Sequence, residues 1–275
     1  IGLTLEKQGR YQEAVESIEK QLRTSTEIGE KLLILSAHGD LGMTYAMMGD
    51  FTRALEHTTR QLELSTAMKV GHDRHLALNH MAELHITCGR LEEAEAFLVQ
   101  AGELLKEKYM ERAEAHTLFT SARLASEKGE SEKALELYER SLEISRKVQS
   151  LSFQHRILME KGTILLDNGR VEEARQAALE SAEIAGKTGM ETAEAGTDSL
   201  QGRVSCAEGD LQEGLRKLRR ACVTYRRLGT RYHLAVNLRW LGELLGEEED
   251  GPLRLEEARR LFSEMGLEFR PRMLP

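Results

Sequence analysis

The chain has 275 residues, of which 31% are charged, 5% are aromatic and only three are proline, and its formal net charge is −8. Few prolines together with many Ala, Leu, Glu, Lys and Arg residues favour helices throughout and argue against a sheet-rich fold. The negative charge argues against a general nucleic-acid-binding protein, and no apolar run is long enough to span a membrane. Three widely spaced cysteines without pairing motifs indicate a reducing compartment. We therefore expect a cytoplasmic, all-α protein whose partners are neither nucleic acids nor membranes.

Glycine recurs at intervals of 40 residues along the chain. The series comprises Gly9, Gly49, Gly89, Gly129, Gly169 and Gly209. Five residues after each of these comes a small residue: Ala14, Ala54, Ala94, Ala134, Ala174 and Gly214. Seven residues before each comes another: Gly2, Gly42, Ala82, Ala122, Gly162 and Gly202. We expect the recurring glycine to end one helix in a left-handed conformation, and the small residues to let two paired helices approach closely.

The predicted elements are helix pairs that follow this period in chain order. The units span residues 1–28, whose first helix is incomplete, then 29–68, 69–108, 109–148, 149–188, 189–228 and a C-terminal cap at 229–275. In the cap, the last helix is predicted from Leu255 to Gly266. Together they predict one continuous solenoid over residues 1–275.

The pattern Leu41-Gly42-x-x-Tyr45-x-x-x-Gly49-Asp50-Phe51-x-x-Ala54 resembles the tetratricopeptide repeat. The usual repeat has about 34 residues. A unit of 40 is similar to the long-helix variety of kinesin light chains, Leu-Gly-Asn repeat proteins and bacterial signalling proteins. The resemblance implies a right-handed superhelical solenoid of about seven antiparallel helix pairs. It also implies that ligands lie along a concave face built from the first helix of each pair.

Candidate groove residues follow from the repeat register. They are Asn79, Glu83, His116, Phe119, Arg123, Arg156, Met159, Arg203 and Arg239. Four of these are arginines, and the planar guanidinium group suits carboxylates. We therefore predict an acidic peptide, or a peptide that presents its C-terminal carboxylate, as the ligand. The alternative is that the arginines pair inside the protein with Glu83, Glu127, Glu160 or Asp167.

The remaining chemistry-bearing residues are expected to be structural. His75, His80 and His85 are five residues apart and therefore do not share one helical face, and no His-Glu-x-x-His motif occurs. Neither Cys88, Cys206 nor Cys222 has a flanking pattern beyond the repeat. We predict no catalytic residue, no metal site and no cofactor, so the chain is not expected to be an enzyme.

The stretch from Ser181 to Gly189 reads SAEIAGKTG and resembles the end of a phosphate-binding loop. Such a loop needs a glycine five residues before Gly186, where this chain has Ser181, and it needs a preceding strand. Gly189 instead falls in register with Gly29 and Gly229, at a position that Lys69, Tyr109 and Gln149 occupy in other units. We therefore predict a helix end between two units, with no bound nucleotide.

These patterns predict a non-catalytic scaffold that binds a protein or a peptide. Since Ile1 corresponds to the middle of a first helix, we expect the regulatory or sensory region of a larger bacterial signalling protein, with an effector domain upstream. The alternative is a stand-alone peptide receptor, or an assembly scaffold comparable to a co-chaperone-like adaptor.

Overall fold

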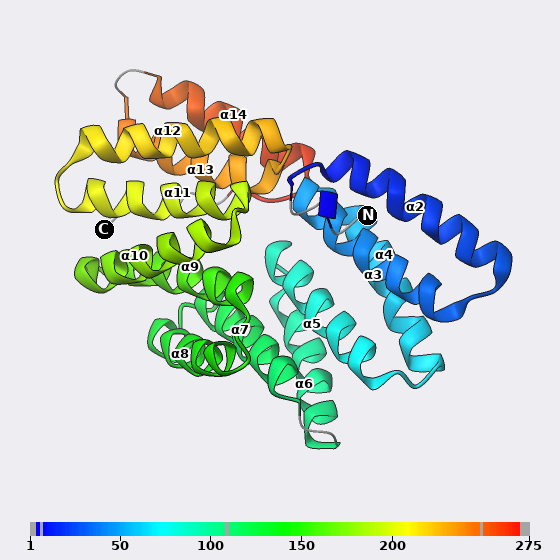
Figure 1. Cartoon of the computed structure of the whole chain (residues 1–275). Helices are drawn as coiled ribbons and strands as arrows, with labels where there is room; N and C mark the ends of the chain where they lie inside the picture. The colour runs from blue at the N-terminus through cyan, green and yellow to red at the C-terminus, as the bar shows by residue number, and fades with distance from the viewer. Residues whose placement is uncertain (1–3, 6–7, 108–109, 248–249, 270–275) are drawn as a thin grey trace. The chain divides into compact units, whose positions relative to one another are not determined.

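The computed structural model describes residues 4–5, 8–107, 110–247 and 250–269 (Figure 1). In these ranges the chain forms helices and no strand, which confirms the all-α prediction. The helices are α2 Tyr11–Ile28, α3 Lys31–Met48, α4 Phe51–Ala67, α5 Gly71–Thr87, α6 Leu91–Glu107, α7 Glu111–Glu127, α8 Ser131–Lys147, α9 Leu151–Asp167, α10 Val171–Thr188, α11 Glu191–Ala207, α12 Leu211–Leu228, α13 Arg231–Leu245 and α14 Gly251–Glu264. Gly2 and Tyr109, which belong to the repeat register, lie outside the described residues.

The helices end where the recurring glycines lie. After α3, Gly49 adopts a left-handed φ of 79° and donates its N–H to the carbonyl of Ala46 at 3.0 Å, and Asp50 donates to Tyr45 at 2.9 Å. Both bonds satisfy carbonyl groups that the helix leaves without a partner. The other glycines of the series also have positive φ values: Gly9, Gly89, Gly129, Gly169 and Gly209. The expected helix ends are therefore confirmed.

Small residues lie where the paired helices approach most closely. A Cβ atom on Gly42 of α3 would lie 2.5 Å from Oγ1 of Thr58 in α4. A Cβ atom on Gly202 of α11 would lie 2.9 Å from the backbone oxygen of Gly214 in α12. Since real Cβ atoms do not approach other atoms so closely, larger residues there would push the two helices apart.

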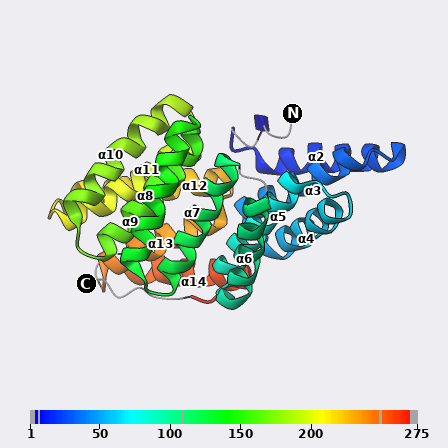
Figure 2. The same ribbon diagram turned by 90° about the horizontal axis from the view of Figure 1, so that it is seen from below.

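The helices group into two compact units, Ile1–Ser141 (unit 1) and Leu142–Pro275 (unit 2), which divide within α8. In unit 1, α3 packs on α4 and α5 on α6. In unit 2, the pairs are α9 with α10, α11 with α12 and α13 with α14 (Figures 1 and 2). The helix that begins each pair is called its first helix, and α7 takes this place by the repeat register. First helices also contact each other, α5 with α7 and α9 with α11. The division into seven repeat units stays a prediction.

The last helix differs from its predicted bounds. It begins at Gly251, before the predicted start at Leu255, and Pro252 lies in its first turn. Proline fits there because the first N–H groups of a helix have no partner inside the helix. Gly251 is required for close packing, since a Cβ atom at this position would lie 2.2 Å from the backbone oxygen of Gly246.

Candidate functional site

One carboxylate on the first helices of unit 1 faces two basic side chains. Glu83 of α5 lies 2.6 Å from Nε2 of His116 and 3.5 Å from Nη1 of Arg123, both on α7. Arg123 also donates to Oγ1 of Thr87 at 3.4 Å. The side chains of the three ionisable residues are 12 to 16% exposed, so they reach the surface. This Glu83–His116–Arg123 cluster can exchange hydrogen bonds with a polar ligand.

Two other predicted groove residues of unit 1 lie below the surface. Asn79 is 0% exposed and donates to the backbone oxygen of His75 at 3.0 Å and to Oγ1 of Thr117 at 3.3 Å. Phe119 is 1% exposed and packs on Tyr138 with ring centroids 5.8 Å apart. Both side chains therefore fill the contacts between helices in this structure.

Buried histidine–threonine contacts join neighbouring first helices in both units. Nε2 of His75 on α5 lies 2.9 Å from Oγ1 of Thr117 on α7. In unit 2, Nε2 of His155 on α9 lies 3.2 Å from Oγ1 of Thr197 on α11. Burial is the main reason why the pKa of each histidine is lowered, to about 4 for His75. The sequence analysis did not identify these contacts, although each pair repeats after 80 residues.

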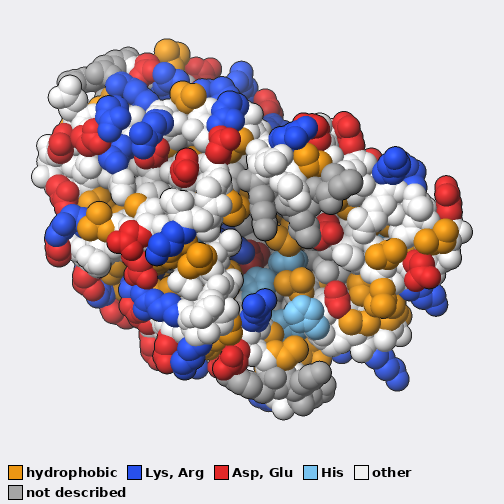
Figure 3. Space-filling view, viewed as in Figure 1, with side chains coloured by type: hydrophobic (Ala, Val, Ile, Leu, Met, Phe, Trp, Pro, Cys, Tyr) orange, Lys and Arg blue, Asp and Glu red, His pale blue; other side chains and the backbone are white. Residues whose placement is uncertain are grey.

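The histidines of the His72–His85 run do not gather into a metal site in the part of the chain that the structure describes. No three His, Cys, Asp or Glu side chains come together there in a group that could hold a metal ion. Histidine side chains are visible at the surface where Figure 1 places α5 (Figure 3). On α5, His85 packs against Phe97 with ring centroids 5.3 Å apart, as expected for a packing position.

A second polar cluster links three first helices of unit 2. Arg203 of α11 donates to Asp167 at 2.8 Å and to Thr163 at 3.3 Å, both on α9. Its guanidinium carbon also lies 4.0 Å from the centroid of the Trp240 ring on α13. The Arg203 side chain is 9% exposed. Ion pairing and cation–π stacking therefore hold this arginine inside the unit.

Arg123 and Arg203 occupy the same register position, two repeats apart. Each reaches the residues that lie 40 and 36 positions earlier in the chain. These are Glu83 and Thr87 for Arg123, and Thr163 and Asp167 for Arg203. The acidic residue and the threonine have exchanged places, so the carboxylate lies one helical turn further along in unit 2.

The other predicted groove residues of unit 2 differ in exposure. Arg156 on α9 is exposed, with its guanidinium carbon 5.7 Å from the ring centroid of Phe153. Met159 is partly buried, and its sulfur accepts a hydrogen bond from the hydroxyl of Ser181 at 3.3 Å. Arg239 is 8% exposed, and its Nε atom lies 3.7 Å from Oε1 of Glu243.

The internal pairing that the sequence left as an alternative is present at Arg123 and Arg203, through Glu83 and Asp167. Arg239 has an acidic neighbour that the sequence analysis did not name, Glu243. The nine residues as a ligand-binding surface stay a prediction.

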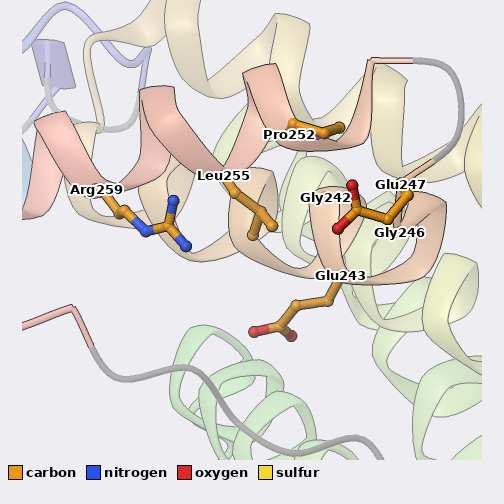
Figure 4. Close-up of a pocket in the computed structure, with 7 residues that line it drawn as sticks. All are labelled: Gly242, Glu243, Gly246, Glu247, Pro252, Leu255 and Arg259. Atoms are coloured by element: carbon orange, nitrogen blue, oxygen red, sulfur yellow. The ribbon is translucent and has the colours of Figure 1, made fainter.

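A pocket of about 360 Å³ opens between α13 and α14 in unit 2 (Figure 4). It is lined by Gly242, Glu243, Gly246, Glu247, Pro252, Leu255 and Arg259. In Figure 4 the side chains of Glu243 and Arg259 extend from the two helices that form it. The lining combines carboxylates, one guanidinium and apolar groups.

Two of the cysteine thiols, those of Cys206 and Cys222, are largely shielded from solvent. Burial raises the pKa of both Cys206 and Cys222, which keeps these thiols protonated and weakly nucleophilic.

Gly186 and Lys187 are exposed residues within α10, and Gly189 ends that helix with a φ of 61°. A phosphate-binding loop would instead place these residues before the start of a helix.

Comparisons with known proteins agree with the repeat register. A tetratricopeptide repeat family model matches residues 1–67 and 73–147, and a second tetratricopeptide repeat model matches residues 119–189. No curated protein sequence matches the chain. No helix in the described ranges is long and apolar enough to cross a membrane.

Several solved structures have a similar fold. The Rap conjugation gene regulator of the plasmid pLS20, in complex with the Phr* peptide, has a TM-score of 0.80 at 15% identity, over 96% of this chain and 72% of that one. A Rap protein complexed with Competence and Sporulation Factor has a TM-score of 0.77 at 12% identity, with the same coverage. A signal transduction ATPase with a tetratricopeptide repeat sensor, PH0952 from Pyrococcus horikoshii, has a TM-score of 0.59 at 16% identity, over 92% of this chain and 36% of that one. Similarity at these identities shows a shared all-α repeat fold.

Proposed function

Because the chain belongs to the tetratricopeptide repeat family, we propose that it is a non-catalytic scaffold that binds a protein or a peptide through its first helices. The observation that carries this proposal is the Glu83–His116–Arg123 cluster, in which ionisable side chains from two first helices meet at the surface. Stacked helix pairs bury their apolar groups between the helices and form an extended surface. Polar side chains on that surface can contact a ligand.

The proposed ligand is an acidic peptide or a peptide with a free C-terminal carboxylate. Arg123 already faces the carboxylate of Glu83 at 3.5 Å, and a ligand carboxylate offers that guanidinium the same kind of partner. Arg156 is an exposed arginine on a first helix of unit 2. Arg203 pairs with Asp167 and stacks on Trp240, so its guanidinium group is less accessible to a ligand than that of Arg156.

Structures with similar folds support a peptide as the ligand. The pLS20 regulator was solved with the Phr* peptide and the second Rap protein with Competence and Sporulation Factor. The PH0952 protein carries its tetratricopeptide repeats as the sensor of a longer chain. We propose that this chain is likewise a cytoplasmic sensory region of a larger bacterial signalling protein, with an effector domain upstream. A stand-alone peptide receptor or assembly scaffold is the alternative, and the gene sequence upstream of Ile1 distinguishes the two.

Fluorescence titration of the whole chain with peptides tests the proposed ligand class. Trp240 is the only tryptophan and stacks on Arg203, so it reports changes around the second polar cluster. Acidic peptides with a free C-terminus should bind more tightly than the same peptides with an amidated C-terminus, and basic peptides should bind least. Labelled peptides followed by anisotropy give the affinities directly.

Two variants test the proposed arginine contacts separately, one in unit 1 and one in unit 2. Arg123→Gln and Arg156→Gln should each weaken binding of the acidic peptide about tenfold, because each removes a charged hydrogen bond worth about 1.5 kcal/mol. The matched control is Arg175→Gln on α10, an exposed arginine paired with Glu172, which should bind as the unmodified chain does. Equal affinity in all three variants would contradict the proposed surface. Failure of every peptide to bind would contradict peptide recognition itself.

A further inference from the structure

Two histidines of unit 1 face each other across the pair of helices α3 and α4. His38 lies on α3 and His57 on α4, and their Nδ1 atoms are 3.0 Å apart. The ring centroids are 5.1 Å apart, and both side chains are partly exposed. Gly42 on α3, which cannot accept a Cβ atom beside Thr58, keeps the two helices at the short separation that this contact needs.

The surroundings of both rings disfavour the charged imidazolium form. The pKa of His38 is lowered to about 4, mainly by burial and with smaller contributions from the neighbouring His57 and Arg60. Burial also lowers the pKa of His57, although Glu56 and Glu19 oppose that effect. One neutral ring carries its hydrogen on Nδ1 and donates it to the Nδ1 atom of the other. The neutral imidazole is also the form that binds metal ions.

The distance between the two nitrogens matches the spacing of ligands on one metal ion. With metal–nitrogen bonds of about 2.0–2.1 Å, two nitrogens at a right angle lie about 2.9 Å apart, and two at the tetrahedral angle about 3.3 Å apart. The observed separation of 3.0 Å, at which the two rings share a hydrogen bond, lies between these two values. Imidazole nitrogens suit copper(II), nickel(II) and zinc.

We propose that His38 and His57 form a two-histidine site for a late first-row divalent cation such as nickel(II). Nδ1 of each ring binds the ion, and water molecules occupy the other coordination positions. The ring that donated its Nδ1 hydrogen then carries this hydrogen on Nε2, so both rings stay neutral and no proton is lost. The two histidines are 19 residues apart in the sequence, and the sequence analysis considered only the histidine run at 72–85. This proposal does not depend on the proposed peptide-binding function.

Titration of the untagged whole chain with nickel(II) chloride tests the site, by calorimetry and by thermal unfolding. His38→Asn and His57→Asn are suitable variants because asparagine places a polar atom near the position of Nδ1 and can keep the contact between the helices. Each variant should bind nickel(II) at least about tenfold more weakly, since even outer groups of a metal site contribute this much. Nickel(II) should raise the melting temperature of the unmodified chain and leave that of both variants nearly unchanged, because the ion connects α3 to α4.

The exposed His72 on α5 provides the matched control. His72→Asn should retain the affinity and the thermal shift of the unmodified chain. The proposal is overturned if the unmodified chain does not bind nickel(II), or if His38→Asn and His57→Asn bind as it does. An equal loss in His72→Asn would place the ion elsewhere and would also overturn it.

Discussion

At the scale of single residues, buried polar side chains connect one helix pair to the next. His75 contacts Thr117, and His155 contacts Thr197, across first helices that are neighbours in each unit. A buried polar group costs free energy unless it has a partner, so these contacts favour one register of packing over others. The acid–threonine pairs beside Arg123 and Arg203 act in the same way closer to the surface.

The titration of His75 predicts a loss of stability in acid. Mainly through burial, with contributions from His116 and His72, its pKa falls from 6.5 to about 4. As the pH falls through this range, unfolded chains bind a proton that the folded chain does not, and the free energy of unfolding decreases. The decrease is at most about 3 kcal/mol and is reduced by solvent screening. His75→Gln should therefore lose less stability than the unmodified chain between these pH values, measured by urea unfolding.

Thr117→Val separates the hydrogen bond of His75 from its titration. This variant removes the hydroxyl that lies 2.9 Å from Nε2 of His75 and that also accepts a hydrogen bond from Asn79 at 3.3 Å. It should lower the free energy of unfolding by about 1 kcal/mol at every pH. If His75→Gln showed the same pH dependence as the unmodified chain, the titration of His75 would not account for the loss in acid.

At the scale of helices, the turn between repeats keeps its geometry even where glycine is missing. Gly29 donates to Thr26 at 3.2 Å after α2, and Lys69 donates to Thr66 at 3.2 Å after α4. Lys69 and Gln149 adopt left-handed φ values of 56° and 52°, close to those of the glycines that occupy the same register position. These two residues therefore adopt a backbone conformation that their side chains disfavour.

Lys69→Gly and Gln149→Gly should each stabilise the protein. The left-handed conformation costs a residue with a Cβ atom about 1–2 kcal/mol, and glycine avoids most of this at a smaller entropic cost. We expect the free energy of unfolding in urea to rise by about 0.5–1 kcal/mol for each. The reverse substitution, Gly29→Lys, should lower it, although no atom would lie within 4 Å of the new Cβ atom. Destabilisation by both glycine variants would show that the side chains at 69 and 149 make contacts that outweigh the strain.

At the scale of the whole molecule, the two compact units contain the same kind of helix pair. In such repeat proteins each pair is stabilised by its immediate neighbours, so a local defect should open nearby helices first. Gly202 and Gly186, both in helices of unit 2, allow a matched comparison. A Cβ atom on Gly202 would meet the backbone of Gly214 at 2.9 Å, whereas one on Gly186 would have no atom within 4 Å.

Gly202→Ala should lower the free energy of unfolding by about 1–3 kcal/mol through overpacking. Gly186→Ala should raise it by up to about 1 kcal/mol through helix propensity. Hydrogen exchange followed by mass spectrometry should locate the loss of protection in Gly202→Ala in α11 and α12, while α3 to α6 of unit 1 keep theirs. Equal loss in both units would mean that the chain unfolds as one cooperative body.

The amino-acid sequence by itself determined where the helices end and how they pair. The helix end at Gly49 depends on residues a few positions away, and the close contact at Gly42 depends on a residue at a fixed offset in the repeat. Both features can therefore be predicted from the 40-residue period. The same period placed Arg123 and Arg203 in one register. The start of α14 was missed, because the helix was predicted to begin at Leu255, whereas it begins at Gly251 with Pro252 in its first turn.

Only the tertiary structure decided what each of these side chains contacts. It placed Asn79 and Phe119 below the surface, and it paired Arg123 with Glu83 and Arg203 with Asp167. It also brought His38 to His57. Burial and ion pairing depend on distances of a few ångströms between side chains of different helices, which a helical period leaves open.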